Sequence, residues 1–271
     1  MSDTPGNSAS SRDQAPAKGD VTLRIDGPVA HVTFDRPAAR NAMTFAMYAR
    51  LGEICDELEG RDDLRAIVFR GAGGAFVAGT DISEFTQFTG GEDGVTYEAR
   101  IDETLTRLTR LPAPTLAVID GAAVGGGLAI SAACDLRIVT PRARFGVPIA
   151  RTVGNTLSAA NIARLIRALG DGPVRQMLLL SVLLDGETVH RLGFAGACVP
   201  EAELEAEAAR QVARLCEAAP LTIRACRDLF ARLADSAPDD RDVIARVYGS
   251  RDFREGVSAF TQKRKPEWQG I

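Results

Sequence analysis

Histidine is scarce in this chain, with only two among 271 residues. His31 alternates with Val29 and Thr33 along an expected strand, and His190 precedes Gly193 near an expected helix end. Both positions are typical of surface histidines, so a Ser-His-Asp or Cys-His catalytic set has little support. No His, Cys and Asp residues have the spacing of a metal site, and we expect no bound metal.

Paired cysteines and nucleotide-binding signatures are also lacking. The five cysteines are odd in number, widely spaced and without a C-x-x-C pair, which is typical of reduced thiols in a cytoplasmic protein. No G-x-G-x-x-G opens a helix after the first strand, and no P-loop lysine is present. We therefore expect no separate cofactor.

Excess positive charge and long hydrophobic runs are absent as well. The net charge of −4 gives no overall basic field that would recruit nucleic acid or an anionic membrane. The longest nearly apolar run, Met177–Leu184, is too short to cross a bilayer. Residues 1–19 are rich in Ser, Asp, Pro and Gly and lack the apolar segment of a signal peptide, so we expect a disordered tail. The sequence predicts neither a nucleic-acid nor a membrane partner.

What the chain does contain is an alternation of short apolar strands and amphipathic helices. Val21–Phe34 predicts a hairpin around Asp26-Gly27. Apolar residues recur with helical spacing between Thr44, a suitable N-cap, and Gly60. The same reasoning predicts strands at 66–70, 115–119 and 136–139, helices at 96–111 and 156–169, and a loop at 143–155. This alternation predicts an α/β fold with crossover connections.

Beyond about residue 199 the strand signals stop. The segments at 201–218, 220–234, 239–249 and 252–263 read as helices with charged faces. We therefore expect an α/β core over residues 20–199 and a helical C-terminal region over 200–271. The hydrophobic content of 45% is ample for such a core.

Two glycine-containing turns stand out as candidate binding sites. Gly125–Gly127 follows a strand and opens a helix of small apolar residues, where free backbone N–H groups and a helix dipole favour an anion or a developing oxyanion. These glycines are equally consistent with close packing of helix on strand. The second turn, Ala78–Ile82, also joins a strand to a helix, with Asp81 placed as its N-cap. Two such turns form an oxyanion hole when their donors converge on one oxygen.

Five motifs, in this order and spacing, resemble the crotonase (enoyl-CoA hydratase/isomerase) family. They are FDRPAARNAM, FVAGTDISEF, VIDGAAVGGGLAISAACDLRI, ARFGVPI and DFREGVSAFTQKRKPEW. The resemblance covers nearly everything from Val21 to Trp268. It implies a spiral of repeated ββα units, with C-terminal helices that pack in a homotrimer or a dimer of trimers. It also implies an acyl-CoA thioester as substrate, with coenzyme A entering as part of that substrate.

The resemblance also implies roles for particular residues. The thioester oxygen is expected to accept hydrogen bonds from the backbone N–H groups of Thr80 and Gly126. Lys263 would meet the CoA phosphates from a neighbouring subunit, or would belong to a solvated charged tail. The residues expected to line the CoA channel are Ala38, Ala78, Asp81 and Ile82.

The chain departs from the family at its catalytic acids. Hydratases of the family use two glutamates to position a water and move its proton, and the matching positions here, also substrate-facing, are Ala129 and Ile149. Isomerases that keep only the second glutamate are not matched either. Arg151, two residues beyond Ile149, would either face a carboxylate-bearing acyl group or have a structural role, and we favour the structural role. The other polar residues near the loops, for which we also favour structural roles, are Thr80, Glu84 as an acid in the first turn of a helix, Asp120 as a turn residue before Gly121, Asn155 as a helix N-cap, and Thr156.

Two functions from different classes remain. The first is an enzyme that stabilises an acyl-CoA enolate but carries out a reaction less dependent on the missing acids, such as decarboxylation or thioester hydrolysis. The second is a non-catalytic acyl-CoA-binding or assembly protein of the same fold. Efficient two-glutamate hydration is not expected, because general acid–base steps contribute about 10²–10⁴-fold each.

Overall fold

The computed structural model describes residues 19–234, 250–262 and 264–271 of the chain. Its main sheet has six strands in the order β1-β2-β3-β4-β6-β9. β1 and β2 are antiparallel, and every later neighbour pair is parallel. The predicted α/β class is therefore confirmed. The strands are β1 Asp20–Asp26, β2 Val29–Asp35, β3 Ala66–Gly71, β4 Thr115–Ile119, β6 Leu136–Val139 and β9 Ala197–Cys198.

The first two strands form the predicted hairpin. Gly27 has φ of 54°, a left-handed conformation that glycine adopts without strain. Along β2, Ala30, Val32 and Phe34 are buried, whereas the residues between them are half-buried. This alternation places one face of the hairpin on the core.

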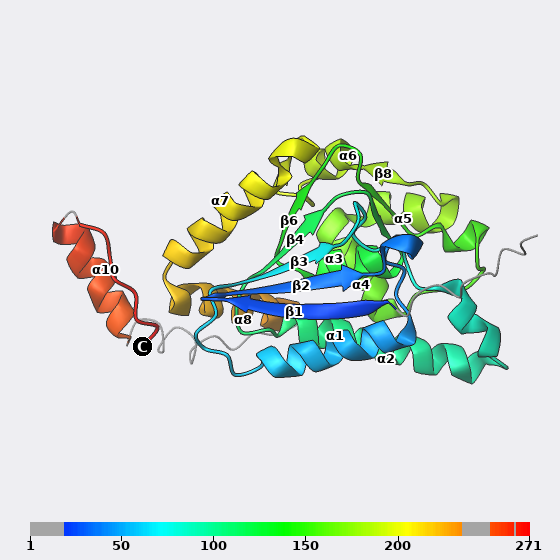
Figure 1. Ribbon diagram of the computed structural model, residues 1–271, viewed down its shortest axis with the longest axis horizontal. Helices are drawn as coiled ribbons and strands as arrows, with labels where there is room; N and C mark the ends of the chain where they lie inside the picture. The colour runs from blue at the N-terminus through cyan, green and yellow to red at the C-terminus, as the bar shows by residue number, and fades with distance from the viewer. Residues whose placement is uncertain (1–18, 235–249, 263) are drawn as a thin grey trace, which may run out of the picture.

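The central strands β3 and β4 are buried on both faces, which explains their nearly continuous apolar sequences. Helix α1 (Phe45–Leu58) packs on one face, with Leu51 and Ile54 in the same cluster as Ile67 and Phe69 of β3. Helix α7 (Leu204–Glu217) covers the other face, where it meets Val68. Figure 1 shows α1 and α2 (Gly91–Thr109) below the sheet and α7 across its other side.

A second, three-stranded sheet crosses beside the first, in the order β5-β7-β8. Its strands are β5 (Ala122–Val124), β7 (Arg144–Gly146) and β8 (Leu184–Asp185). The prediction of a loop over 143–155 is therefore wrong, because β7 and a short 3-10 helix, η3 (Pro148–Arg151), lie within it. A three-residue strand is too short for a visible alternation, and its partners are distant in sequence.

The predicted helix boundaries hold to within a few residues. The Thr44 side chain accepts a hydrogen bond from the Met47 amide and caps α1, as predicted. Helix α2 begins at Gly91 and not at residue 96, because the Asp93 carboxylate accepts from the Gly90 amide and caps an earlier turn. Ser158 caps α4, so Asn155 is not the N-cap considered from the sequence.

Figure 1 shows α10 standing apart from the sheet. The helix predicted over 239–249, residues 1–18 of the predicted tail over 1–19, and Lys263 lie outside the described residues, and the domain boundary at residue 200 stays a prediction. The remaining helices are α3 Gly126–Ala133, α4 Ala159–Leu169, α5 Asp171–Leu180, α6 Gly186–Arg191, α8 Pro220–Ala234 and α10 Arg251–Gln262, with 3-10 helices η1 Pro37–Ala39, η2 Ile82–Gln87 and η4 Glu201–Glu203.

In the part of the chain that the structure describes, no helix combines the length and apolarity needed to span a membrane.

Candidate active site

The two predicted turns lie side by side. Val77 pairs with Ala123 of β5, and three residues later Thr80 pairs with Met43 on the opposite side. A Cβ built on Gly79 would lie 3.5 Å from the Val124 carbonyl oxygen. The turn before η2 therefore lies between Met43 on one edge and β5, with the turn before α3, on the other.

The amides of Thr80 and Gly126 are both free to bind a ligand. The Gly79 carbonyl accepts from the Met43 amide at 2.8 Å, and because a trans peptide is planar the Thr80 N–H points the opposite way. The Gly125 carbonyl accepts from the Ala129 amide at 3.1 Å, so the Gly126 N–H points out of the N-terminus of α3. Within the described residues, neither N–H donates a hydrogen bond.

Each of the three glycines of the triplet is required for a different structural reason. Gly125 has φ of 54°, and a Cβ there would lie 3.7 Å from the Gly79 α-carbon. A Cβ on Gly127 would overlap the Val77 carbonyl, so this glycine permits close packing of helix on strand. A Cβ on Gly126 would overlap the Tyr48 hydroxyl. The close-packing interpretation therefore applies at Gly127, and the anion-binding interpretation of the triplet stays a prediction.

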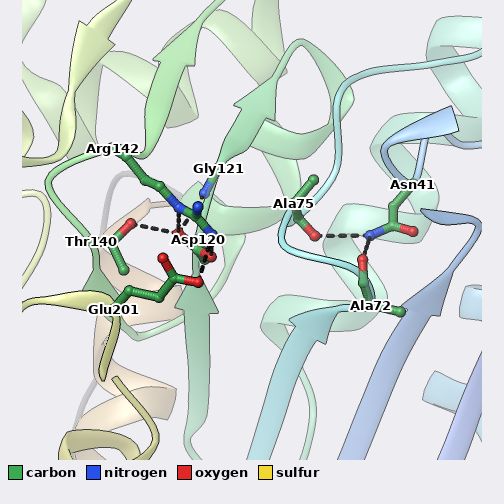
Figure 2. A network of polar contacts seen from close by, with 8 residues as sticks. All are labelled: Asn41, Ala72, Ala75, Asp120, Gly121, Thr140, Arg142 and Glu201. Atoms are coloured by element: carbon green, nitrogen blue, oxygen red, sulfur yellow. Dashed lines mark hydrogen bonds and ion pairs between the residues drawn. The ribbon is translucent and has the colours of Figure 1, made fainter. Parts of the chain in front are cut away.

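Asn41 fixes the approach to the first turn. It is fully buried and adopts φ of 59°, a left-handed conformation that asparagine tolerates. Its Nδ2 donates to the carbonyls of Ala72 and Ala75, each at 2.8 Å, and its Oδ1 accepts from the Arg36 amide at 2.8 Å. Figure 2 shows the Asn41 side chain reaching into the chain that follows β3. One side chain thus ties two segments that flank Ala78–Thr80.

Asp120 fixes the approach to the second turn. Its Oδ1 accepts from the Gly121 amide at 3.0 Å and from Thr140 Oγ1 at 2.7 Å, and the carboxylate pairs with Arg142. Arg142 also donates to Glu201 at 2.9 Å (Figure 2). Burial alone would raise the pKa of Asp120, but the hydrogen bonds from Arg142 and Thr140 outweigh burial and lower it. The turn role predicted for Asp120 is confirmed.

Three hydroxyl groups meet beside the two free amides. Thr80 Oγ1 lies 3.0 Å from the hydroxyl of Tyr48 on α1 and 2.7 Å from the hydroxyl of Tyr97 on α2. The position of a Cβ on Gly126 lies 3.5 Å from the same Thr80 Oγ1. We call Tyr48, Thr80 and Tyr97 the hydroxyl cluster.

Both tyrosines of the hydroxyl cluster are held in their neutral form. Burial raises the pKa of Tyr97 to about 12, and burial raises the pKa of Tyr48 well above its usual value. The phenols are therefore hydrogen-bond donors, and not bases, at neutral pH.

Two cavities adjoin Tyr97. The first, of about 550 Å³, lies between α1 and α2 and is lined by Phe45 and Tyr48 as well as Tyr97. The second, of about 650 Å³, lies between α2 and the segment that enters α4, with a mainly apolar wall that includes Phe88 and Leu157. We call them the α1/α2 cavity and the α2/α4 cavity. Thr80 and Gly126 line neither cavity, and Tyr97 connects both to Thr80 through its hydroxyl.

Glu98 places a half-buried carboxylate on the wall of the α2/α4 cavity. Burial raises its pKa, whereas a hydrogen bond from the Ser158 amide at 2.7 Å opposes this shift. One carboxylate oxygen is therefore committed to the N-terminus of α4.

The structure brings only some of the predicted site residues to the two turns. Ala129, one turn along α3 from Gly126, is buried, and Ile149 on η3 is half-buried. The Asp81 carboxylate caps η2 as predicted, accepting from the Ser83 amide at 3.0 Å, and also pairs with buried Arg36 at 2.7 Å. Hydrogen bonds from Ser83 and Arg36 lower the pKa of Asp81 despite some burial. The other predicted residues near the turns are half-buried Ala78 and Glu84, and exposed Ala38, Ile82, Arg151, Asn155 and Thr156. Their predicted roles toward a ligand stay predictions.

Sequence reasoning missed Tyr48, Tyr97 and Glu98. Tyr48 is one residue from Met47, inside an amphipathic helix, where a tyrosine is ordinary. The only available signal was that the whole chain has three tyrosines. Among the described residues, no group of three or more His, Cys, Asp or Glu side chains has the arrangement of a metal site.

Comparison with known proteins identifies the family of the chain. The family described as Enoyl-CoA hydratase/isomerase matches residues 24–270. The chain is 31% identical to a "Probable enoyl-CoA hydratase" of Bacillus subtilis, over 92% of this chain and 98% of that protein. It is 32% identical to "Enoyl-CoA hydratase domain-containing protein 2, mitochondrial" of Homo sapiens, over 95% of this chain and 92% of that protein.

Solved structures give the same result. An enoyl-CoA hydratase/carnithine racemase from Magnetospirillum magneticum superposes with a TM-score of 0.87 and 29% identity, covering 93% of this chain and 96% of that one. An enoyl-CoA hydratase of Mycobacterium smegmatis superposes with a TM-score of 0.86 and 30% identity, covering 92% of this chain and 98% of that one. The predicted crotonase-like fold, with its C-terminal helices, is confirmed. This chain belongs to the enoyl-CoA hydratase/isomerase family.

Proposed function

We propose that the protein is an enzyme that binds an acyl-CoA thioester and stabilises its enolate with the backbone amides of Thr80 and Gly126. The observation that carries the proposal is the contact between the two turns. Within the described residues, the Thr80 and Gly126 amides of these turns have no hydrogen-bond acceptor. Each such donor is worth about 2.7–4 kcal/mol of transition-state stabilisation when it faces the developing oxyanion. The names of the related proteins support the same class of substrate.

The reaction we propose is not two-glutamate hydration. Ala129 and Ile149 stand where the family resemblance places the catalytic acids, and neither hydrocarbon side chain can donate or accept a proton. A reaction that forms the enolate without removing an α-proton, such as decarboxylation, or one that cleaves the thioester, fits these residues better. A panel of enoyl-, malonyl-type and aryl-CoA thioesters offered to the purified protein tests this proposal, and the absence of turnover on all of them would refute it.

A non-catalytic acyl-CoA-binding protein is the second candidate, and the buried alanine at position 129 favours it. Titration calorimetry separates the two candidates. Binding of an acyl-CoA with no product formed supports the binder, whereas absence of binding contradicts both. A homotrimer or dimer of trimers stays our proposal for the assembly, with Lys263 or another C-terminal residue meeting the CoA phosphates.

Restoring the two acids is a direct test of the site geometry. We expect the double variant Ala129→Glu/Ile149→Glu to hydrate crotonyl-CoA faster than the unchanged protein, because the carboxylates would then flank the proposed enolate site. Burying carboxylates without partners is costly, so thermal melting must show that the variant is folded. A folded double variant with an unchanged hydration rate would mean that positions 129 and 149 do not face the substrate.

A further inference from the structure

The α2/α4 cavity has a wall that suits an apolar ligand. The rings of Phe85, Phe88 and Tyr97 form part of this wall, with their centroids 5.0–6.1 Å apart. Leu157, in the segment that enters α4, forms another part. A cavity of about 650 Å³ with aromatic and aliphatic side chains around it is typical of a site for a small organic molecule.

The α1/α2 cavity is less suitable, because ionised side chains line it. They include Asp56, Glu103 and Arg107, and the Arg107 guanidinium donates to both carboxylates. A hydrocarbon chain placed there would remove these ion pairs from water, which is costly. Of the two cavities beside Tyr97, the α2/α4 cavity is therefore the better one for an apolar group.

Tyr97 connects the α2/α4 cavity to the first of the two turns. Its ring lines the cavity, and its hydroxyl lies 2.7 Å from Thr80 Oγ1. Thr80 also carries one of the two free amides. An acyl group whose thioester oxygen accepts from that amide therefore has only the length of one tyrosine side chain to cross before its distal carbons enter the cavity.

The charged groups in the wall of the α2/α4 cavity are both acidic. Glu98 and Asp102 line it, and the described residues around it include no Lys, Arg or His. Arg164 of α4 interacts electrostatically with Asp102, but it forms no ion pair with it and does not line the cavity. An acyl group that ends in a carboxylate would meet two like charges here and no cation, which disfavours it.

Gly94 leaves part of the cavity open. It lies within α2 and is half-buried, and a Cβ built on it would meet no atom within 4 Å. Glycine is unfavourable inside a helix, so local helix stability does not account for its presence at this position. Because Gly94 lines the cavity, a larger side chain there would extend into it.

We infer that the α2/α4 cavity holds the distal part of the acyl group, that this group is neutral, apolar and longer than crotonyl, and that Gly94 sets the size it can reach. The inference rests on the proposed function and deepens it by naming the class of acyl group. Each methylene that moves from water into the cavity strengthens binding about fourfold.

Titration calorimetry on the full-length protein tests the inference with acyl-CoA analogues in which a methylene replaces the thioester sulfur, so that no cleavage occurs. The three analogues carry a butyryl, an octanoyl and a suberyl group, and suberyl has the length of octanoyl with a terminal carboxylate. We expect the octanoyl analogue to bind at least about tenfold more tightly than either of the others. Equal Kd values for all three would overturn the inference.

Variants assign this preference to the α2/α4 cavity. Gly94→Leu should weaken binding of the octanoyl analogue about tenfold and change the Kd of the butyryl analogue less than about threefold, and its higher helix propensity favours folding. The matched controls are Gly172→Leu on α5, where a Cβ also meets no atom, and Ala49→Leu in the α1/α2 cavity. Both should keep the octanoyl preference. Its loss in Ala49→Leu and not in Gly94→Leu would overturn the inference.

A further variant tests the selection against charge. Glu98→Gln keeps an acceptor for the Ser158 amide and removes the carboxylate, so it should narrow the difference between the octanoyl and suberyl analogues at least about threefold. An unchanged difference would contradict the role given to Glu98.

The inference and the proposed function fail in different ways. Equal binding of the three analogues, together with turnover of acyl-CoA thioesters, overturns the inference and leaves the proposed function standing. Absence of binding of all three analogues overturns the inference, and it overturns the proposed function as well when the thioester panel shows no turnover.

Discussion

At the scale of single residues, the site depends on groups that are small or neutral. Gly126 leaves room for the Tyr48 hydroxyl, and burial keeps Tyr48 and Tyr97 protonated. The site therefore contains hydrogen-bond donors, and neither tyrosine acts as a base beside them. Such a set stabilises negative charge that develops on an oxygen, and it does so without reorganising at the moment of reaction.

Substitution of Gly126 tests this directly. In Gly126→Ala the new methyl group would displace the Tyr48 hydroxyl and narrow the space in front of the amide, so we expect acyl-CoA turnover to fall on the order of 100-fold. The matched control is Gly172→Ala on α5, where a Cβ would meet no atom within 4 Å. That control should keep its activity and gain up to about 1 kcal/mol of stability from helix propensity. Equal activity in both variants would contradict a substrate role for Gly126.

At the scale of elements, the two turns are positioned by polar contacts that do not involve the hydroxyl cluster. Asn41 joins the segment after β2 to the segment after β3, and Asp120 joins the end of β4 to Thr140 and Arg142. Both side chains satisfy backbone groups that strand pairing leaves open, which is the common task of a buried polar side chain. Their loss would shift the turns relative to each other.

The Asp120 contacts predict an acid-dependent loss of stability. Because the folded protein lowers the pKa of Asp120 below its usual 3.8, the carboxylate stabilises the fold above that value and loses its contribution as pH falls through the lowered pKa. We expect Asp120→Asn to be less stable than wild type near neutral pH, with the gap closing on acidification. Urea unfolding at about pH 7 and about pH 3 measures this gap. A gap that widens in acid would contradict the assignment.

At the scale of the whole molecule, the main sheet is covered on both faces, and α10 lies apart from it (Figure 1). The segment after α10 contacts the end of α7, where Trp268 Nε1 donates a hydrogen bond to the Glu217 carbonyl at 3.0 Å. A helix that packs little against its own sheet leaves surface for another copy of the chain. This arrangement supports the proposed trimeric assembly.

Light scattering coupled to gel filtration measures the assembly. We expect the mass of three or six chains of 28.8 kDa. A protein lacking residues 251–271 serves as the comparison and should form smaller species, because it lacks α10. A stable monomer of the full-length chain would contradict the proposed assembly.

Local sequence patterns were sufficient for much of the fold. The hairpin at Asp26-Gly27, the Thr44 cap of α1 and the strand Thr115–Ile119 each follow from interactions within a few residues, so their sequences carry the signal. The same holds for the Asp81 cap. The early start of α2 and the strand β7 were not predicted, because one depends on a capping aspartate without an apolar pattern and the other on a distant partner.

The sequence by itself determined the family, the α/β class and the absence of carboxylates at positions 129 and 149, since these are properties of residue identity and order. Only the tertiary structure decided which side chains stand beside the Thr80 and Gly126 amides. Tyr48 and Tyr97 come from different helices, and a hydrogen bond between groups on separate elements exists only after packing brings their atoms within about 3 Å.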